Sequence, residues 1–228
     1  MNTITTLQQY LKDTGRYFGT VDGLWGRLTA AAILLGLTDG PDTPLTDADY
    51  EASAKRLSVP AAYVKAFASV EAAGAGFQDG KPKILPERHC FSKATGRRFD
   101  QSHPDLSYPK WGAKPYPKTQ DARYDLLLKM VRLDVDAGFG ACSYGKFQIL
   151  GSNFESCGYS SPMEFAFALA KDEPTQLKAF EGFIRRNGIL APLVAGDWAQ
   201  VARRYNGPGY RENAYDTKLA AAARKFGA

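Results

Sequence analysis

The sequence predicts a mainly α-helical protein with one small β-hairpin, preceded by a small helical module. Apolar residues recur at helical spacing along most of the 228 residues, and capping boxes begin at Thr46 and Ser161. Asp79-Gly80 stands between two short apolar segments, which is the strongest hairpin signal in the chain. Four glycines within 15–26 mark tight turns between the first two predicted helices.

Residues 1–40 are predicted to form the small module. Leu7 and Leu11 lie on one face of a short helix, and an Ala/Leu-rich second helix covers 28–37. A unit of about 40 residues without disulfides or a metal is marginally stable alone. We therefore expect the module to depend on contacts with the rest of the chain. Turn-forming residues at 41–45 then make a linker.

Residues 46–228 are predicted to form a larger, mainly helical domain. Helices are expected over 46–57, 61–73, 126–135, 172–186, 198–205 and 211–226, with a further helix after the cap at Ser161. Pro60 opens the second of these helices, and Gly74 and Gly76 are expected to end it. Segment 102–118 is rich in proline and aromatic residues. It is either a disordered insertion or an ordered loop that lines a cleft, and its aromatic residues favour the loop.

Composition excludes several classes of protein. The chain is 44% apolar and only 23% charged, which excludes intrinsic disorder. No apolar run approaches the roughly 18 residues of a membrane span, so we expect no integral membrane segment. Residues 1–6 lack the basic start and apolar stretch of a signal peptide. We therefore expect synthesis in the cytoplasm without an export signal.

The net charge of +5 is concentrated at one end of the chain. Segment 178–228 carries nine Lys and Arg residues against four Asp and Glu residues, which accounts for the whole excess. A cationic end suits an anionic polymer, either nucleic acid or the bacterial cell surface. A solvated basic face without a partner is the alternative. Since no nucleic-acid-binding motif accompanies the charge, we expect no nucleic-acid partner.

The cysteines Cys90, Cys142 and Cys157 are expected to be packed, inert residues. They are too few and of the wrong parity for a disulfide framework, and they lack the neighbouring histidine and acid that would indicate a nucleophile. With the two histidines, His89 and His103, they form no close-spaced zinc pattern such as CxxC. We therefore expect no metal site and no cofactor.

Glu71 is the first candidate catalytic residue. It is the only carboxylate in the predicted helix over 61–73, and it lies near the C-terminal end of that helix. Partial burial and the negative carbonyl ends of the helix both disfavour the ionised form and raise the pKa. A raised pKa suits a general acid at neutral pH. The alternative is an ordinary solvated glutamate.

Three segments resemble the N-acetylmuramidase domain of modular phage endolysins. They are 70–77 (VEAAGAGF), 82–89 (PKILPERH) and 143–149 (SYGKFQI), and they follow in the family's order. The Tyr-Asn-Gly turn at 205–207 resembles the same lysozyme-like group. The resemblance implies a lysozyme-like catalytic domain over 46–228 that hydrolyses the β-1,4 bond between N-acetylmuramic acid and N-acetylglucosamine in peptidoglycan. In that reaction, the resemblance implies that the general acid is Glu71.

The first 40 residues resemble a peptidoglycan-binding module. The resemblance rests on 7–11 (LQQYL), 21–23 (VDG) and 25–26 (WG). Its candidate wall-binding residues are Tyr17, Asp22, Gly23 and Trp25. Two neighbouring modules for one substrate imply an endolysin that lyses the host cell, with peptidoglycan as its partner and tethering raising the effective substrate concentration. The resemblance also implies release from the host cytoplasm through a phage-made pore, and we expect a monomer.

Glycoside cleavage normally requires a second carboxylate. Glu87 is the first candidate, because it is expected to end the second hairpin strand and to face Glu71 across the cleft. Asp79 is the alternative by its shorter spacing, although beside Gly80 its simpler role is the turn itself. The chain departs from the family at Pro86, where Phe is common, and this proline removes a backbone donor beside Glu87.

Further polar residues are candidates for sugar binding through hydroxyl, amide or imidazole groups. They are His89, Ser143, Tyr144, Gln148, Tyr205 and Asn206. His89 is also a candidate to orient Glu87, although a structural histidine is the simpler interpretation. The resemblance implies that 143–149 lines one side of the cleft and that the turn at 205–207 lines the other.

Three alternative functions remain open at this point. A lytic transglycosylase would use the same acid, Glu71, but would let a hydroxyl of the substrate attack and leave an anhydro end. A chitinase-like enzyme could share the fold, although the N-terminal module favours peptidoglycan. A non-catalytic protein that binds the cell wall or nucleic acid is supported only by the basic end of the chain.

Overall fold

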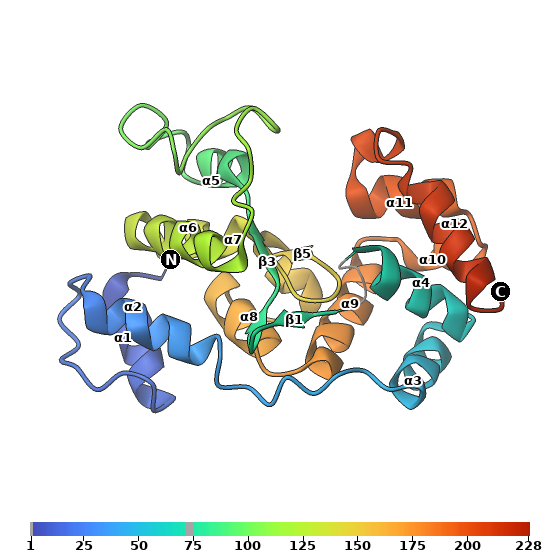
Figure 1. The fold of residues 1–228 in the computed structure, drawn as a ribbon, viewed down its shortest axis with the longest axis horizontal. Coiled ribbons are helices and arrows are strands. Elements are labelled where there is room, and N and C mark those ends of the chain that lie inside the picture. The colour runs from blue at the N-terminus through green and yellow to red at the C-terminus, as the bar shows by residue number, and fades with distance from the viewer. Residues whose placement is uncertain (1, 72–74) are drawn as a thin grey trace.

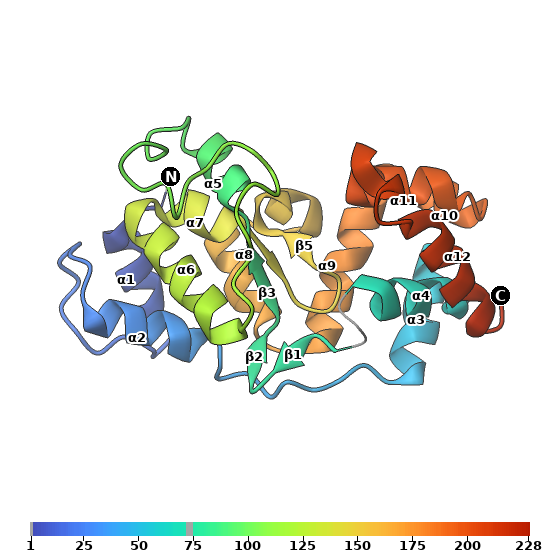
Figure 2. The same cartoon turned by 45° about the horizontal axis from the view of Figure 1, so that its top comes forward.

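Helices dominate the molecule, and two small antiparallel sheets lie between them (Figure 1). The computed structural model describes residues 2–71 and 75–228. The N-terminal helices lie at one end of the molecule, and the C-terminal helices lie at the other (Figures 1 and 2). This arrangement agrees with the mainly α class predicted from the sequence.

The described helices, in chain order, are α1 (Ile4–Asp13), α2 (Arg27–Gly36), α3 (Asp47–Leu57), α4 (Ala61–Glu71), α5 (Arg88–Ala94), α6 (Gln120–Leu133), α7 (Val135–Gly140), α8 (Pro162–Leu169), α9 (Glu173–Arg186), α10 (Leu190–Val194), α11 (Trp198–Asn206) and α12 (Tyr215–Lys225), with the 3₁₀ segments η1 (Gly151–Cys157) and η2 (Pro208–Arg211). Side-chain caps explain several of their starts. Thr46 and Asp49 form a full capping box at α3, and Asp172 accepts a hydrogen bond from the Thr175 backbone at α9.

Most helix boundaries agree with the predictions, and three differ. The helix expected over 126–135 begins earlier, at Gln120, because Thr119 caps it, and it ends where Asp134 caps α7. The C-terminal helix begins at Tyr215 rather than at 211, after η2. Helices α5, α7 and α10 were not predicted. The expected continuation of α4 to residue 73 and its stop at Gly74 lie outside the described residues. Among the described helices, none combines the length and the apolar character that crossing a membrane requires.

The predicted hairpin is present, and a second sheet accompanies it. Strands β1 (Phe77–Gln78) and β2 (Lys81–Pro82) pair across the Asp79-Gly80 turn, in which both residues have positive φ, at 54° and 72°. The second sheet has the order β3-β4-β5, with β3 (Ile84–Pro86), β4 (Cys142–Tyr144) and β5 (Ile149–Leu150). Glu87 therefore follows β3 of this second sheet, which corrects the expectation that it ends the hairpin. Pro86 is tolerated there because β3 is an edge strand.

The first forty residues pack against the large domain through one shared hydrophobic core. Leu7 and Ile33 belong to the same buried cluster as Phe167. The Tyr10 and Phe167 rings stack with centroids 5.3 Å apart, and a Cβ atom added at Gly36 would lie 2.8 Å from Phe167. The expected dependence of this small unit on the rest of the chain is therefore seen in its packing.

A buried ion pair joins three distant segments. The Glu173 carboxylate lies 2.9 Å from the Lys146 ammonium, and both side chains are buried. The same carboxylate accepts hydrogen bonds from the Gly76 and Leu45 backbone N–H groups, at 2.7 and 2.9 Å. Glu173 thus fixes the connection between α2 and α3, the turn after β4 and Gly76, which immediately precedes β1.

Candidate active site

A cleft of 780 Å³ opens between the sheet and the C-terminal helices. We call its two sides the sheet wall, formed by β3, β4, β5 and α5, and the helix wall, formed by the end of α11, η2 and the start of α12. Glu71, from the last turn of α4, and Glu87, from the sheet wall, both line this cleft. Two carboxylates that the sequence places sixteen residues apart therefore face the same cavity.

Glu71 lies in surroundings that favour the protonated form of its carboxyl. Burial raises the pKa of the Glu71 carboxyl from its usual 4.5 to about 7, and a hydrogen bond from Asn206 opposes this rise. The Asn206 Nδ2 atom donates to Glu71 Oε1 at 3.1 Å. Burial is thus the dominant cause, as the sequence predicted. A pKa of this size leaves a large fraction of the acid form at pH 7.

Asn206 stands at the end of α11, where Gly207 with φ 84° turns the chain away. Its Oδ1 atom is buried and has no hydrogen-bond partner among the described residues. A buried acceptor without a partner costs free energy, so this oxygen suits an incoming N–H or hydroxyl group of a sugar. Asn206 therefore lines the cleft, as expected, and it also contacts Glu71, which was not predicted.

Glu87 lies in a polar environment that differs from that of Glu71. It is the N-cap residue of α5, and its side chain is 18% exposed. The Tyr116 hydroxyl donates to Glu87 Oε2 at 3.0 Å, and His89 Nδ1 lies 3.4 Å from the same oxygen. Asp79, the alternative second carboxylate, is an exposed turn residue and is not among the described residues that line the cleft.

The family model for N-acetylmuramidases matches residues 60–227, well over half of the chain. The chain belongs to the N-acetylmuramidase family. It is therefore a glycoside hydrolase, and the predicted enzyme class is confirmed.

The muramidase is also similar to a solved phage enzyme. The crystal structure of the Burkholderia AP3 phage endolysin superimposes with a TM-score of 0.71 at 31% sequence identity, covering 98% of this chain and 94% of that one. Among proteins with curated descriptions, none matches significantly. The structural likeness extends over residues 1–40 as well as the catalytic domain, whereas the family model begins at residue 60.

The predicted sugar-binding residues of the muramidase divide into two groups. His89, Ser143, Gln148, Tyr205 and Asn206 line the cleft, but Tyr144 is not among its lining residues. Tyr144 is 1% exposed, and its hydroxyl donates to the Phe139 carbonyl at 3.0 Å, so the expected sugar contact is not supported by its position.

Two of the cleft residues also have structural hydrogen bonds. The Tyr205 hydroxyl donates to the Phe147 carbonyl at 2.7 Å. The Gln148 amide nitrogen donates to the Gly145 carbonyl at 2.8 Å, and Gln148 itself has a positive φ of 46°. These two residues shape the walls, whereas Ser143 and Asn206 retain groups that suit a sugar.

The contact between Tyr116 and Glu87 was not predicted from the sequence. Tyr116 and the half-exposed Trp111 come from segment 102–118, so the interpretation of this segment as an ordered loop beside the cleft is correct. Its aromatic composition was the available signal. A hydroxyl that holds Glu87 and an indole at the cleft rim are both useful to an enzyme that acts on sugars.

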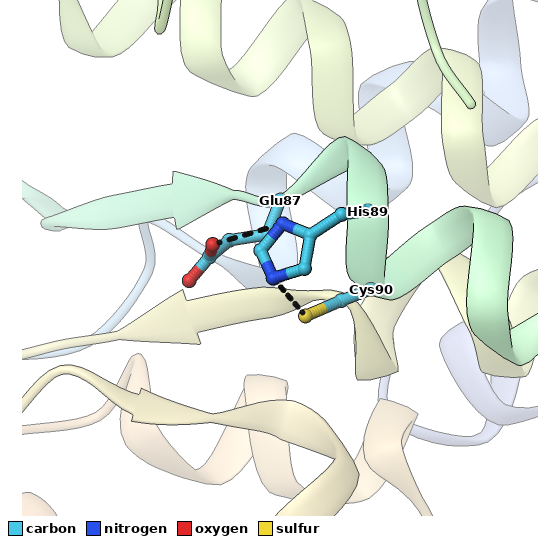
Figure 3. Close-up of side chains that lie close together, drawn as sticks. All are labelled: Glu87, His89 and Cys90. Atoms are coloured by element: carbon cyan, nitrogen blue, oxygen red, sulfur yellow. Dashed lines mark hydrogen bonds and ion pairs between the residues drawn. The ribbon is translucent and has the colours of Figure 1, made fainter. Parts of the chain in front are cut away.

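Cys90 has the histidine and acid neighbours that the sequence analysis did not expect for any cysteine (Figure 3). Its Sγ atom lies 3.4 Å from His89 Nε2, and the other ring nitrogen faces Glu87. Burial, followed by the Glu87 charge, raises the pKa of the Cys90 thiol to about 12, so Cys90 is not a thiolate nucleophile. Burial likewise raises the pKa of Cys157 to about 12.

The predicted wall-binding residues of the first module mainly hold its loop together. The Gln8 side chain accepts hydrogen bonds from the Asp22 and Gly23 backbones at 3.1 and 2.8 Å, and it donates to the Tyr17 hydroxyl at 3.2 Å. Tyr17 is buried, so it is no surface contact, and Trp25 is half-buried. Large apolar side chains are exposed nearby instead. They are Phe18, Leu24 and Leu28, at 88%, 70% and 65% exposure.

Proposed function

We propose that this muramidase cleaves the β-1,4 bond between N-acetylmuramic acid and N-acetylglucosamine with Glu71 as the general acid and Glu87 as the second carboxylate. The observation that carries the proposal is the shared cleft. One carboxyl in it is buried and has a pKa of about 7, and the other is hydrogen-bonded by Tyr116. Glycosidases use two carboxyl groups whose environments assign them different roles.

Glu71 starts the reaction by donating its proton to the glycosidic oxygen. As the proton leaves, the carboxylate gains negative charge, and the Asn206 N–H group at 3.1 Å stabilises that charge. Burial favours the protonated acid before the step, and the amide limits the cost of ionisation during it. At neutral pH Glu71 is therefore present both as the protonated acid and as the carboxylate, as efficient proton transfer requires.

Glu87 acts on the sugar carbon that loses the leaving group. Its carboxylate activates a water molecule or attacks the carbon itself, the two courses open to glycosidases. Tyr116 and His89 hold Glu87 Oε2 in one orientation, which reduces the reorganisation needed in the transition state. His89 and Tyr116 are therefore positioning residues in this proposal.

Residues 1–40 are proposed to hold the enzyme on the cell wall. The linker 41–45 joins them to the catalytic domain, residues 46–228. The support is the exposed apolar surface of Phe18, Leu24 and Leu28 and the likeness of the whole chain to a phage endolysin. Sedimentation of Phe18→Ser with insoluble peptidoglycan tests this part, and binding equal to that of the parent chain would contradict it. As an endolysin, the enzyme would reach the wall from the host cytoplasm through a phage-made pore.

Mass spectrometry of fragments released from purified peptidoglycan tests the proposed reaction. Hydrolysis by a muramidase leaves reducing muramic acid ends, whereas a lytic transglycosylase leaves anhydro ends and a glucosaminidase leaves reducing glucosamine ends. The Glu87→Gln variant is the companion test, with an expected fall in turnover of about 100-fold or more. Anhydro products, or near-normal turnover of Glu87→Gln, would remove Glu87 from the mechanism.

A further inference from the structure

Three different metal-ligating atoms converge at the start of α5. Glu87, His89 and Cys90 offer an oxygen, a nitrogen and a sulfur atom that all lie within 4.8 Å of one another (Figure 3). The change of direction from β3 into α5 brings them together, since Glu87 caps the helix and the other two residues occupy its first turn. All three line the cleft and are half-buried, so a small ion can enter from solvent.

The distances suit a tetrahedral ion. Zinc binds thiolate sulfur at about 2.3 Å and imidazole nitrogen at about 2.0 Å, which places two such ligands about 3.5 Å apart at a tetrahedral angle. His89 Nε2 and Cys90 Sγ are 3.4 Å apart. The Glu87 carboxylate lies 3.4 Å from the other ring nitrogen, His89 Nδ1, and belongs to the same group of ligand atoms within 4.8 Å. A turn of the Glu87 side chain toward the Nε2 side of the ring therefore completes the set.

The donor set selects one class of cation. Magnesium and calcium prefer sites made only of oxygen atoms, whereas a mixture of thiolate, imidazole and carboxylate suits zinc and its neighbours in the first transition series. Three protein ligands leave a fourth position for water or another small ligand on the cleft side.

We propose that Glu87, His89 and Cys90 bind a zinc-class divalent cation and that the bound cation inhibits the muramidase. Binding replaces the proton of the Cys90 thiol by the metal and releases that proton to solvent. The inhibitory part rests on the proposed function, because only there does Glu87 have a catalytic role. A carboxylate bound to a dication can neither activate water nor attack the sugar, and the ion also occupies the space in front of it.

Cobalt titration tests the binding independently of activity. Co²⁺ added to the full chain should produce the near-ultraviolet absorption of a cobalt–thiolate bond and the visible bands of a tetrahedral ion. Cys90→Ala should lose the thiolate absorption and bind Zn²⁺ at least about 100-fold more weakly, since even the loss of an outer partner costs roughly 10–100-fold. His89→Gln should weaken binding similarly. Cys157→Ala, which removes another half-buried thiol, is the matched control and should bind as the parent chain does.

Turnover measurements test the inhibition. Zn²⁺ should lower peptidoglycan hydrolysis by the parent chain and by Cys157→Ala at least tenfold, and a chelator should restore it. Cys90→Ala should keep its basal activity and escape the inhibition. Absence of the thiolate absorption, or equal Zn²⁺ affinity in Cys90→Ala, would overturn the site and leave the role of Glu87 untouched. Tight binding without inhibition would overturn the inhibitory part and count against Glu87 as the second carboxylate.

Discussion

Two carboxylates in the interior of this muramidase stand at opposite ends of their helices. Glu173 is the first residue of α9, where the helix dipole favours negative charge, and the buried Lys146 ammonium lies 2.9 Å away. Glu71 is the last described residue of α4, where the dipole disfavours negative charge, and no described cation lies within ion-pair distance of it. The two helix ends therefore have opposite effects on a carboxylate: the N-terminus at Glu173 favours its negative charge, and the C-terminus at Glu71 disfavours it.

The surroundings of Glu173 suit a structural acid, whereas those of Glu71 suit its proposed role as a general acid. The Glu173 oxygens form an ion pair with the buried Lys146 and accept hydrogen bonds from two backbone N–H groups, so the negative charge is compensated within the fold. Glu71 has one amide neighbour and faces the cleft, so its proton can be lost and regained.

Replacing Glu71 by Gln should have the largest effect. The amide keeps the shape of the side chain but cannot donate an acidic proton, so turnover on purified peptidoglycan should fall by about 10³–10⁴-fold. Circular dichroism and thermal unfolding should show a native fold. Retained activity in a folded Glu71→Gln variant would contradict the assignment of the acid.

Replacing Glu173 by Ala should mainly reduce stability. The change leaves the buried Lys146 ammonium without this carboxylate, and breaking such a pair costs roughly 3–5 kcal/mol of the free energy of unfolding. Asp121→Ala is the control, because it breaks an ion pair whose acid is 83% exposed and should cost less than about 1 kcal/mol. Equal losses in urea denaturation of the two variants would show that the Glu173 pair is not special.

The stability of the parent chain should depend on pH through Glu71. Burial raises its pKa in the folded state to about 7, above the 4.5 of an ordinary glutamate. Below pH 4.5 both states hold the proton and Glu71 has no effect. As the pH rises to 7, only the unfolded state loses it, so stability falls by about 3 kcal/mol and then levels. Urea denaturation of Glu71→Gln at pH 4 and pH 8 should reveal this as a growing advantage of the variant; a constant difference would contradict it.

Replacing Asn206 by Ala should have the smallest effect of the four. The variant loses the hydrogen bond that lowers the pKa of Glu71, so the alkaline limb of the kcat/KM profile should move to higher pH. The value of kcat/KM should fall roughly tenfold, the equivalent of the about 1.5 kcal/mol that a hydrogen bond to a charged group contributes. A lower rate with an unmoved limb would indicate that Asn206 binds only sugar.

Local sequence signals predicted much of the fold but not the second sheet. Helix caps and the Asp79-Gly80 turn are local, and both are where expected. Strands β3, β4 and β5 are only two or three residues long, and β3 and β4 lie far apart in the chain. Nothing local to Ile84 indicates that Tyr144 is its partner, because pairing over such a separation is decided by tertiary packing.

A residue of the candidate site was predictable from the sequence where its type is unusual for its own segment. Glu71 stands alone as an acid in an apolar helix, and its raised pKa follows from that setting. Tyr116 holds Glu87 from a loop 29 residues further on, a contact that no pattern in the sequence indicates. The Glu87, His89 and Cys90 cluster was not predicted, because the cysteines and histidines form no close-spaced zinc pattern such as CxxC in the sequence. Its meaning depends on the turn from β3 into α5, which points three side chains the same way.

The shared core of residues 1–40 and the large domain has a consequence for protein engineering. An exchange of the first module requires a cut in the linker at 41–45. Here the cut would uncover apolar surface around Phe167, including the ring that stacks on Tyr10. A chimera that exchanges the first module must therefore carry over the face of α1 and α2 that covers this surface, or supply a new one of the same shape.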